Sequence, residues 1–239
     1  PCLFMDIQSA EMVKYASNAM LACRISFMNE MARLCSHYDA DIANVRRGMS
    51  TDSRIGKDFL YPGLGYGGSC FPKDTLAVIE MGRAAGIDTL LNTAVHDVNQ
   101  AQRHWFIDGL RAHFEQDLTD SRIAVWGLAF KPRTDDIREA PSRTIISALL
   151  ERGATVTGFD PVAGENFRQL GTDLAIADDM YEAARDADAL VICTEWSEFR
   201  TPDFQRLKDT MRCPVIFDGR NLWDPDDMAK RGFHYHCVG

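Results

Sequence analysis

The spacing of the apolar residues changes at Ser121, and this change constrains the fold more than any other feature of the sequence. Before Ser121, apolar side chains recur every three or four residues, which is typical of helices. After it, short apolar runs such as 123–126 and 190–193 alternate with helical segments, which predicts a parallel sheet with helices on both faces. We therefore predict an α + α/β chain: a helical domain over residues 1–115, then a Rossmann-like, doubly wound parallel sheet over 116–239.

The first part of the chain is expected to be all-helical apart from one loop. Ser9 is a candidate N-cap for the first long helix, and Gly86 is placed to end a later one. Residues 61–69 hold four glycines in nine positions and predict a loop. The helices are expected at 9–37, 41–48, 53–60, 72–85 and 89–114.

The second part shows the pattern of alternating strands and helices. The strands are expected at 123–126, 155–159, 190–193 and 215–217, with 233–237 as an edge strand, and the helices at 142–152, 181–187 and 204–210. His234 and His236 would share one face of the edge strand, but no third ligand lies nearby in the sequence. We therefore predict an ordinary edge strand and no metal site.

The composition excludes several classes of function. The formal net charge is −9, shared almost evenly by the two halves, so a nucleic-acid or anionic-membrane partner is not expected. No apolar run approaches the roughly 18 residues that span a bilayer. The seven cysteines show no C-x-x-C spacing, which favours reduced thiols in the cytoplasm. The chain begins without Met or a secretory signal, as a fragment would.

Cys70 is the sharpest candidate for chemistry. It stands between a glycine-rich loop and a predicted helix start at Pro72, so the positive end of the helix dipole would stabilise its thiolate. The preceding glycines allow a ligand to approach the backbone closely. Lys73 adds a positive charge, and Asp74 lies within one turn as a possible base or orienting group. A surface loop followed by an inert structural cysteine fits the same spacing, and the residues alone leave both interpretations open.

Three further groups of residues are weaker candidates. Lys14 and Asn18 lie four residues apart on one helix face, where they would bind an oxyanion or order a water molecule. Lys131 and Arg138 follow the first strand of the sheet, and Arg220 follows another, at the strand ends where ligands gather. A solvated helix face, a charged loop and a plain turn are the alternatives. The dinucleotide fingerprint G-x-G-x-x-G is missing, because the first strand is followed by a single glycine.

Taken together, five segments resemble the UDP-glucose/GDP-mannose dehydrogenase family, particularly its bacterial members that act on UDP-glucose. The segments are 9–19, 54–56, 65–74, 127–138 and 218–221, so the resemblance spans almost the whole chain. The family's N-terminal NAD-binding domain has no counterpart here. The resemblance therefore implies a fragment made of the central helical dimerisation domain and the UDP-binding domain, which alone is expected to be inactive.

The resemblance also implies an activity. The full enzyme would be an oxidoreductase that oxidises the C6 alcohol of UDP-glucose to a carboxylate, with NAD as cofactor, in nucleotide-sugar and polysaccharide metabolism. Cys70 would form a thiohemiacetal and then a thioester with the substrate. Lys14, Asn18 and Asp74 match positions that stabilise the oxyanion and order the water. The central helices would form a homodimer.

Substrate and cofactor residues carry over from the resemblance in the same way. Lys73 and Arg138 match residues that touch NAD, and Arg54 matches an arginine that reaches the site of a neighbouring subunit. The substrate-binding positions are Lys14, Arg54, Phe59, Leu60, Tyr61, Pro62, Gly63, Gly67, Lys131 and Arg220. Two alternatives stay open: a dehydrogenase for GDP-mannose or a UDP-N-acetylhexosamine, and a non-catalytic dimerisation module that binds a nucleotide sugar.

Overall fold

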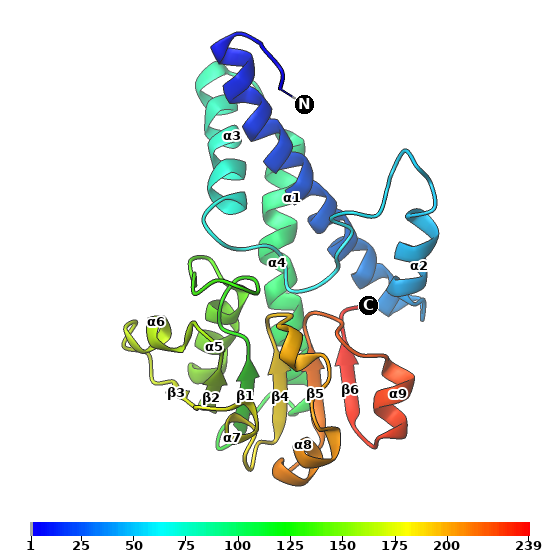
Figure 1. Cartoon of the computed structure of the whole chain (residues 1–239), viewed down its shortest axis with the longest axis vertical. Helices are drawn as coiled ribbons and strands as arrows, with labels where there is room; N and C mark the ends of the chain where they lie inside the picture. Colours follow the sequence, from blue (N-terminus) through cyan, green and yellow to red (C-terminus); the bar gives the residue numbers. More distant parts are fainter. Residues whose placement is uncertain (1) are drawn as a thin grey trace.

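The computed structural model describes residues 2–239 and has a helical part and a sheet part (Figure 1). The helical part contains α1 (Ile7–His37), α2 (Ile42–Met49), α3 (Phe71–Ala85) and α4 (Leu90–His113). The chain starts at the far end of this part and ends where the two parts meet. The predicted combination of a helical first part and an α/β second part is confirmed.

The first helix starts earlier than expected. Asp6, and not Ser9, is its N-cap, because the Asp6 carboxylate accepts a hydrogen bond from the backbone N–H of Ser9 at 2.8 Å. The helix then runs for 31 residues to His37. Its length lets residues near its start contact α3 while residues near its end pack beside α2.

The predicted helix at 53–60 is wrong, and this segment is a series of turns. Gly56 and Phe59 have φ angles of 67° and 59°, which interrupt any right-handed helix. The Arg24 side chain donates hydrogen bonds to the carbonyl groups of Ile55, Gly56 and Asp58. A tertiary contact from α1 thus uses the carbonyl groups that a helix would need for itself.

The sheet has six parallel strands in the order β3-β2-β1-β4-β5-β6 (Figure 1). The strands are β1 (Arg122–Trp126), β2 (Thr155–Phe159), β3 (Ala175–Ile176), β4 (Ala189–Ile192), β5 (Val215–Asp218) and β6 (His234–Cys237). The predicted doubly wound parallel sheet is confirmed, and β6 is the expected edge strand. Because the order reverses between β1 and β4, loops diverge there at the carboxyl ends.

Helices cover both faces of the sheet. Their bounds are α5 (Pro141–Leu150), α6 (Gly164–Arg168), α7 (Met180–Ala183), α8 (Phe204–Thr210) and α9 (Pro225–Lys230). The helix expected at 181–187 is therefore shorter than predicted. Asp186 has a φ of 54° and donates its N–H to the carbonyl of Thr210, which ends the helical turn. The two-residue β3 and the short α6 and α9 carry too little periodicity to be seen in the sequence.

The helical and sheet parts share one hydrophobic core through α4. The first half of this 24-residue helix packs against α1 and α3. Its second half brings Phe106, Ile107 and Leu110 into the cluster that contains Val125 of β1 and Phe217 of β5. The other face of the sheet packs against α7, α8 and α9 in a separate cluster. The predicted domain boundary at residue 115 thus lies just after a helix that contributes to the core shared by the two parts.

We predict that Leu110→Ala destabilises the helical and sheet parts together. Leu110 is fully buried in the shared cluster, so its loss should lower the free energy of unfolding by about 2–5 kcal/mol. Urea unfolding followed by far-ultraviolet circular dichroism and by tryptophan fluorescence should give one shifted transition. The control is Leu90→Ala, whose side chain is 77% exposed. Two separate transitions would contradict a shared core.

Candidate active site

A cavity of about 630 Å³ lies where the glycine-rich loop of the helical part faces the sheet. Aromatic rings and cations dominate its wall. The lining residues are Ile25, Arg46, Phe59, Tyr61, Pro62, Gly65, Tyr66, Gly67, Phe71, Phe130, Lys131, Glu195, Arg200, Arg220 and Asn221.

The sheet contributes the floor of this cavity from the carboxyl ends of three strands. Phe130 and Lys131 follow β1, Glu195 follows β4, and Arg220 follows β5. These strands are neighbours around the point where the strand order reverses. Open parallel sheets bind their ligands at that point, so the topology itself explains the position of the cavity.

The charge of the cavity wall suits an anionic ligand. Arg46, Lys131, Arg200 and Arg220 supply four cations, and Glu195 supplies one carboxylate. The Arg220 Nε lies 3.3 Å from the Glu195 carboxylate, and one of its other nitrogens is buried without a partner. An excess of positive charge in a walled cleft attracts phosphate groups, which guanidinium groups bind through paired hydrogen bonds.

Cys70 lies beside this cavity at the start of α3. It is the N-cap residue of the helix, Pro72 occupies the first turn, and the thiol is exposed. Gly67 and Phe71, on either side of it in the sequence, line the cavity. The predicted position at a helix N-terminus is confirmed, and the thiol is accessible to a ligand.

The three other residues predicted for catalysis meet one turn further along α3. The side chain of Asp74 is fully buried, and one of its oxygens accepts hydrogen bonds from Lys14 Nζ at 2.9 Å and Asn18 Nδ2 at 2.6 Å. Its other oxygen lies 3.4 Å from Lys73 Nζ. Lys14 and Asn18 do project from one face of α1, as their spacing predicted.

The protonation of this cluster follows from its contacts. Burial acts to raise the pKa of Asp74, but hydrogen bonds from Lys14, Asn18 and Lys73 outweigh it and hold that pKa below its ordinary value. The hydrogen bond to Asp74 raises the pKa of Lys14, and the nearby charge of Cys70 acts in the same direction. The cluster is therefore an ionised pair of carboxylate and ammonium close to the thiol.

The predicted substrate-binding residues divide into four groups. Phe59, Tyr61, Pro62, Gly67, Lys131 and Arg220 line the cavity. Leu60 and Gly63 are buried behind its wall, and Lys14 lies with Asp74 beside Cys70. Arg54 is exposed and paired with Asp52, and it does not line the cavity of its own chain. Its predicted role in a neighbouring subunit stays a prediction.

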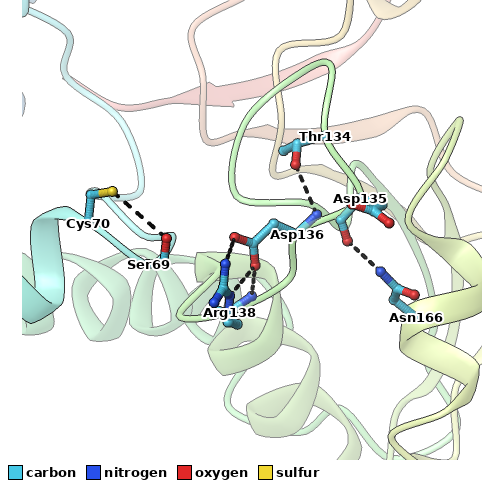
Figure 2. Close-up of polar contacts among 7 residues, drawn as sticks. All are labelled: Ser69, Cys70, Thr134, Asp135, Asp136, Arg138 and Asn166. Atoms are coloured by element: carbon cyan, nitrogen blue, oxygen red, sulfur yellow. Dashed lines mark hydrogen bonds and ion pairs between the residues drawn. The ribbon is translucent and has the colours of Figure 1, made fainter.

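Lys73 and Arg138 are exposed cations near Cys70, as Figure 2 shows for Arg138. Arg138 is held by Asp136 at 2.8 Å, and this hydrogen bond, together with the charge of Cys70, raises the pKa of Arg138. Both cations are suited to the phosphates of a dinucleotide that approaches from outside. The sheet itself does not fit NAD, because the Asp160 carboxylate already occupies the N–H groups of the loop after β1.

Sequence reasoning missed four buried polar residues that hold the glycine loop. Asn99 on α4 exchanges hydrogen bonds with both the N–H and the carbonyl of Tyr66, at 2.8 and 3.1 Å. Arg103 donates to the carbonyl groups of Tyr66 and Glu139, which joins the loop to the sheet part. The other two contacts with the loop come from Gln102 on α4 and Asn29 on α1. On α4, Gln102 and Arg103 follow Asn99 by three and four residues, so the three side chains share one helix face. This spacing was a usable signal, but polar residues are normally assigned to the solvated face.

Gly67 and Gly68 have no room for a side chain. A Cβ on Gly67 would overlap the carbonyl oxygen of Glu139, and a Cβ on Gly68 would lie 2.6 Å from the ring of Phe130. Gly68 also has a φ of 79°, which disfavours any other residue. The loop that ends in Cys70 therefore presses directly against the sheet part.

The part of the chain that the structure describes bears on two other kinds of site, a metal centre and a membrane span. Between residues 2 and 239 no group of three His, Cys, Asp or Glu side chains is arranged to hold a metal ion. Within the same range, no helix is both long and apolar enough to cross a membrane.

Family models match both parts of the chain. A model of the UDP-glucose/GDP-mannose dehydrogenase family, central domain, matches residues 8–101, and one of the family's UDP binding domain matches residues 124–225. The helical part and the sheet part of the chain thus match two domains of one family of nucleotide-sugar dehydrogenases. The chain belongs to the UDP-glucose/GDP-mannose dehydrogenase family.

Individual relatives fit this assignment. The chain is 46% identical to the UDP-glucose 6-dehydrogenase of Rhizobium meliloti and 46% identical to that of Pseudomonas aeruginosa, over 100% and 99% of its length. A UDP-glucose dehydrogenase from Pyrobaculum islandicum superposes with a TM-score of 0.90 at 36% identity, over 100% of this chain and 52% of that one. The chain covers 55% and 54% of the two relatives, so it spans about half of their length.

We predict that Asp74→Asn destabilises the protein in a pH-dependent way. A carboxylate with a lowered pKa stabilises the fold above its ordinary value of 3.8, and the effect is lost as the pH falls through the folded-state pKa. Lys14 has a raised pKa, so its contribution holds below 10.5 and is lost as the pH rises through its folded-state value. At neutral pH the free energy of unfolding of the variant should be about 1.5–3 kcal/mol lower, because Asp74 is buried and two of its partners, Lys14 and Lys73, are charged.

The measurement is urea unfolding of Asp74→Asn and the parent over a pH series. The difference between them should shrink as the pH falls below 3.8. The control is Asp108→Asn, which removes the exposed i,i+3 ion pair with Arg111 and should cost less than about 1 kcal/mol at neutral pH. A pH-independent difference for Asp74→Asn would show that the ionised carboxylate does not stabilise the cluster.

Proposed function

We propose that the chain is the substrate-binding and thiol-bearing part of a UDP-glucose 6-dehydrogenase. The observation that carries the proposal is an exposed cysteine at a helix start, next to an ionised Lys14–Asp74 pair and a cavity with four cations. The whole enzyme would oxidise the C6 alcohol of UDP-glucose to the carboxylate of UDP-glucuronate. NAD, when bound, supplies the hydride acceptor for each of the two oxidations.

Each residue of the cluster has a role in this proposal. The Cys70 thiolate attacks the carbon of the aldehyde-level intermediate, which gives a thiohemiacetal, and loss of a hydride turns this into a thioester. A water molecule then attacks the thioester carbon and releases the carboxylate and the thiol. Lys14 and Asn18 stabilise the oxyanion, and Asp74 holds both donors and orients the water.

The cavity would hold the nucleotide sugar in this proposal. Lys131 and Arg220 bind the anionic part, while Phe59 and Tyr61 contact the sugar and the base. Phe59 has a left-handed φ of 59°, a strained conformation of the kind that gathers at ligand sites. Lys73 and Arg138 would touch NAD from this side.

The proposal extends to assembly and location. Two copies would associate through the central helices, with Arg54 reaching the site of the neighbouring copy. The division into domains at residue 115 belongs to the same proposal. The seven cysteines, all within the described residues, are free, which supports a reducing compartment such as the cytoplasm.

We expect the chain to bind UDP-glucose and to prefer it to GDP-mannose. Lys131→Ala and Arg220→Ala should each weaken binding about tenfold, because each removes a charged hydrogen-bond donor from the cavity. Isothermal titration calorimetry of the purified chain measures both effects. Arg133→Ala is the matched control, since Arg133 is an exposed cation of the same loop outside the cavity wall. Tighter binding of GDP-mannose would point to a dehydrogenase for another nucleotide sugar.

We also expect UDP-glucose to protect Cys70 from alkylation. Cys70 and Cys2 are exposed, whereas burial raises the pKa of Cys193 to about 12 and that of Cys237 to about 11. At neutral pH, Cys193 and Cys237 should therefore react slowly, because the thiolate is the reactive form. Mass spectrometry after brief alkylation should show fast labelling of Cys70 that UDP-glucose suppresses.

Cys2 is the internal control for this experiment, because it is exposed but distant in sequence from the cavity residues. Its labelling should not change with UDP-glucose. Slow labelling of Cys70, equal to that of the buried cysteines, would favour a non-catalytic module that binds a nucleotide sugar.

A further inference from the structure

Two buried aspartates lie directly behind the cations of the cavity without lining it. Asp160 follows the last residue of β2, and Asp218 is the last residue of β5. Their exposed fractions are 6% and 0%. Charged side chains are rarely buried to this extent unless they are fully hydrogen-bonded, so their contacts indicate what they do.

Asp160 holds the loop that follows β1. One of its oxygens accepts hydrogen bonds from the N–H groups of Leu128 and Ala129, at 2.7 and 3.0 Å, and from Trp196 Nε1 at 3.1 Å. Its other oxygen accepts from the turn that follows β2, at the N–H groups of Val162 and Ala163. All five partners are donors, so a carboxylate satisfies them and an amide in either orientation cannot.

The carbonyl groups of the same loop are also fixed. Ser142 Oγ donates to the carbonyl of Leu128, and Thr194 Oγ1 donates to that of Ala129. The next two residues are Phe130, whose ring lies against Gly68 of the cysteine-bearing loop, and Lys131, which lines the cavity. The loop therefore has little freedom, and its exit direction sets the position of Lys131.

Asp218 holds the loop that follows β5 in the same way. It accepts hydrogen bonds from the N–H groups of Arg220 and Leu222, at 2.8 and 2.7 Å, and from the Tyr235 hydroxyl at 2.7 Å. Burial and the charge of Asp218 raise the pKa of Tyr235, so this hydroxyl stays a donor. The Arg220 side chain leaves this loop and donates to the carbonyl of Cys193 at 2.7 Å.

We infer that Asp160 and Asp218 are positioning residues that aim Lys131 and Arg220 at the bound nucleotide sugar. Neither carboxylate touches the ligand, and each acts through a loop whose backbone N–H groups it holds. The inference rests on the proposed function in so far as the ligand is a nucleotide sugar. The same arrangement, a buried aspartate that holds the loop after a strand, occurs twice. The inference therefore applies to Lys131 and to Arg220.

The test measures UDP-glucose binding by Asp160→Asn and Asp218→Asn at several salt concentrations. Each variant should bind at least about tenfold more weakly, because unpaired N–H groups release the loop and its cation. The dependence of affinity on salt should also become less steep, because fewer cations are aligned with the phosphates. A purely structural defect would lower the fraction of competent protein, which calorimetry reports as stoichiometry, and would leave the salt dependence unchanged.

Asp179→Asn is the matched control, because Asp179 also accepts two backbone N–H groups, at the start of α7 and outside the cavity wall. The affinity of this variant for UDP-glucose should stay within about twofold of that of the parent. Thr194→Val is the milder variant if Asp160→Asn fails to fold, and it should weaken binding about threefold, because only one loop hydrogen bond is lost.

The outcomes separate the two proposals. If the parent chain does not bind UDP-glucose, the proposed function fails. If the parent binds and the two aspartate variants and Thr194→Val keep its affinity and salt dependence, the positioning role is wrong while the proposed function stands.

Discussion

The hydrogen bonds between α4 and the glycine loop are the contacts on which the candidate site depends. Asn99 pairs with both polar groups of the Tyr66 backbone, and Arg103 ties that residue to Glu139 of the sheet part. Tyr66, Asn99 and Arg103 are buried, so a polar group that lost its partner among them would cost its full desolvation penalty. The loop therefore occupies one position, and Cys70 at its end is placed by α4 and the sheet as much as by its own helix.

This arrangement explains why the site needs both parts of the chain. The thiol and the Lys14–Asp74 pair come from the helical part, whereas Lys131 and Arg220 come from the sheet. The two sets are brought together by contacts at Gly67 and Gly68 that leave no space for a Cβ. A shift of the sheet against the helical part would therefore move the cations relative to the thiol.

Much of the fold could be predicted from the sequence, because the spacing of apolar residues indicates which face of an element is buried. The change at Ser121 predicted the helical and α/β parts, and the alternation of strands with helices predicted a doubly wound parallel sheet, although not its strand order. The failure at 53–60 has a physical origin, since Arg24 on a distant helix captures the carbonyl groups of that segment. No local pattern reports such a contact.

The candidate site divides in the same way. Helical spacing predicted that Lys14 and Asn18 share one helix face, and the glycines and Pro72 predicted that Cys70 stands before a helix, but only the family resemblance placed these residues in one site. Asn99 and Arg103 were not, because a polar residue in an amphipathic helix is normally solvated and only the packed loop reveals its partner. Arg46 and Arg200 line the cavity from segments that carry no motif.

The sheet also shows how one buried side chain can change the kind of anion site that a topology provides. In a dinucleotide-binding sheet of this order, the N–H groups after β1 face a pyrophosphate, and an acidic residue after β2 faces a ribose. Here the acidic residue, Asp160, turns towards those N–H groups and satisfies them from within the protein. The loop then has no free donors for a pyrophosphate, and its remaining contribution is the side chains that follow, Phe130 and Lys131. One buried carboxylate thus removes the backbone anion site of this topology, and the positive charge at this edge of the sheet comes instead from side chains that line the cavity.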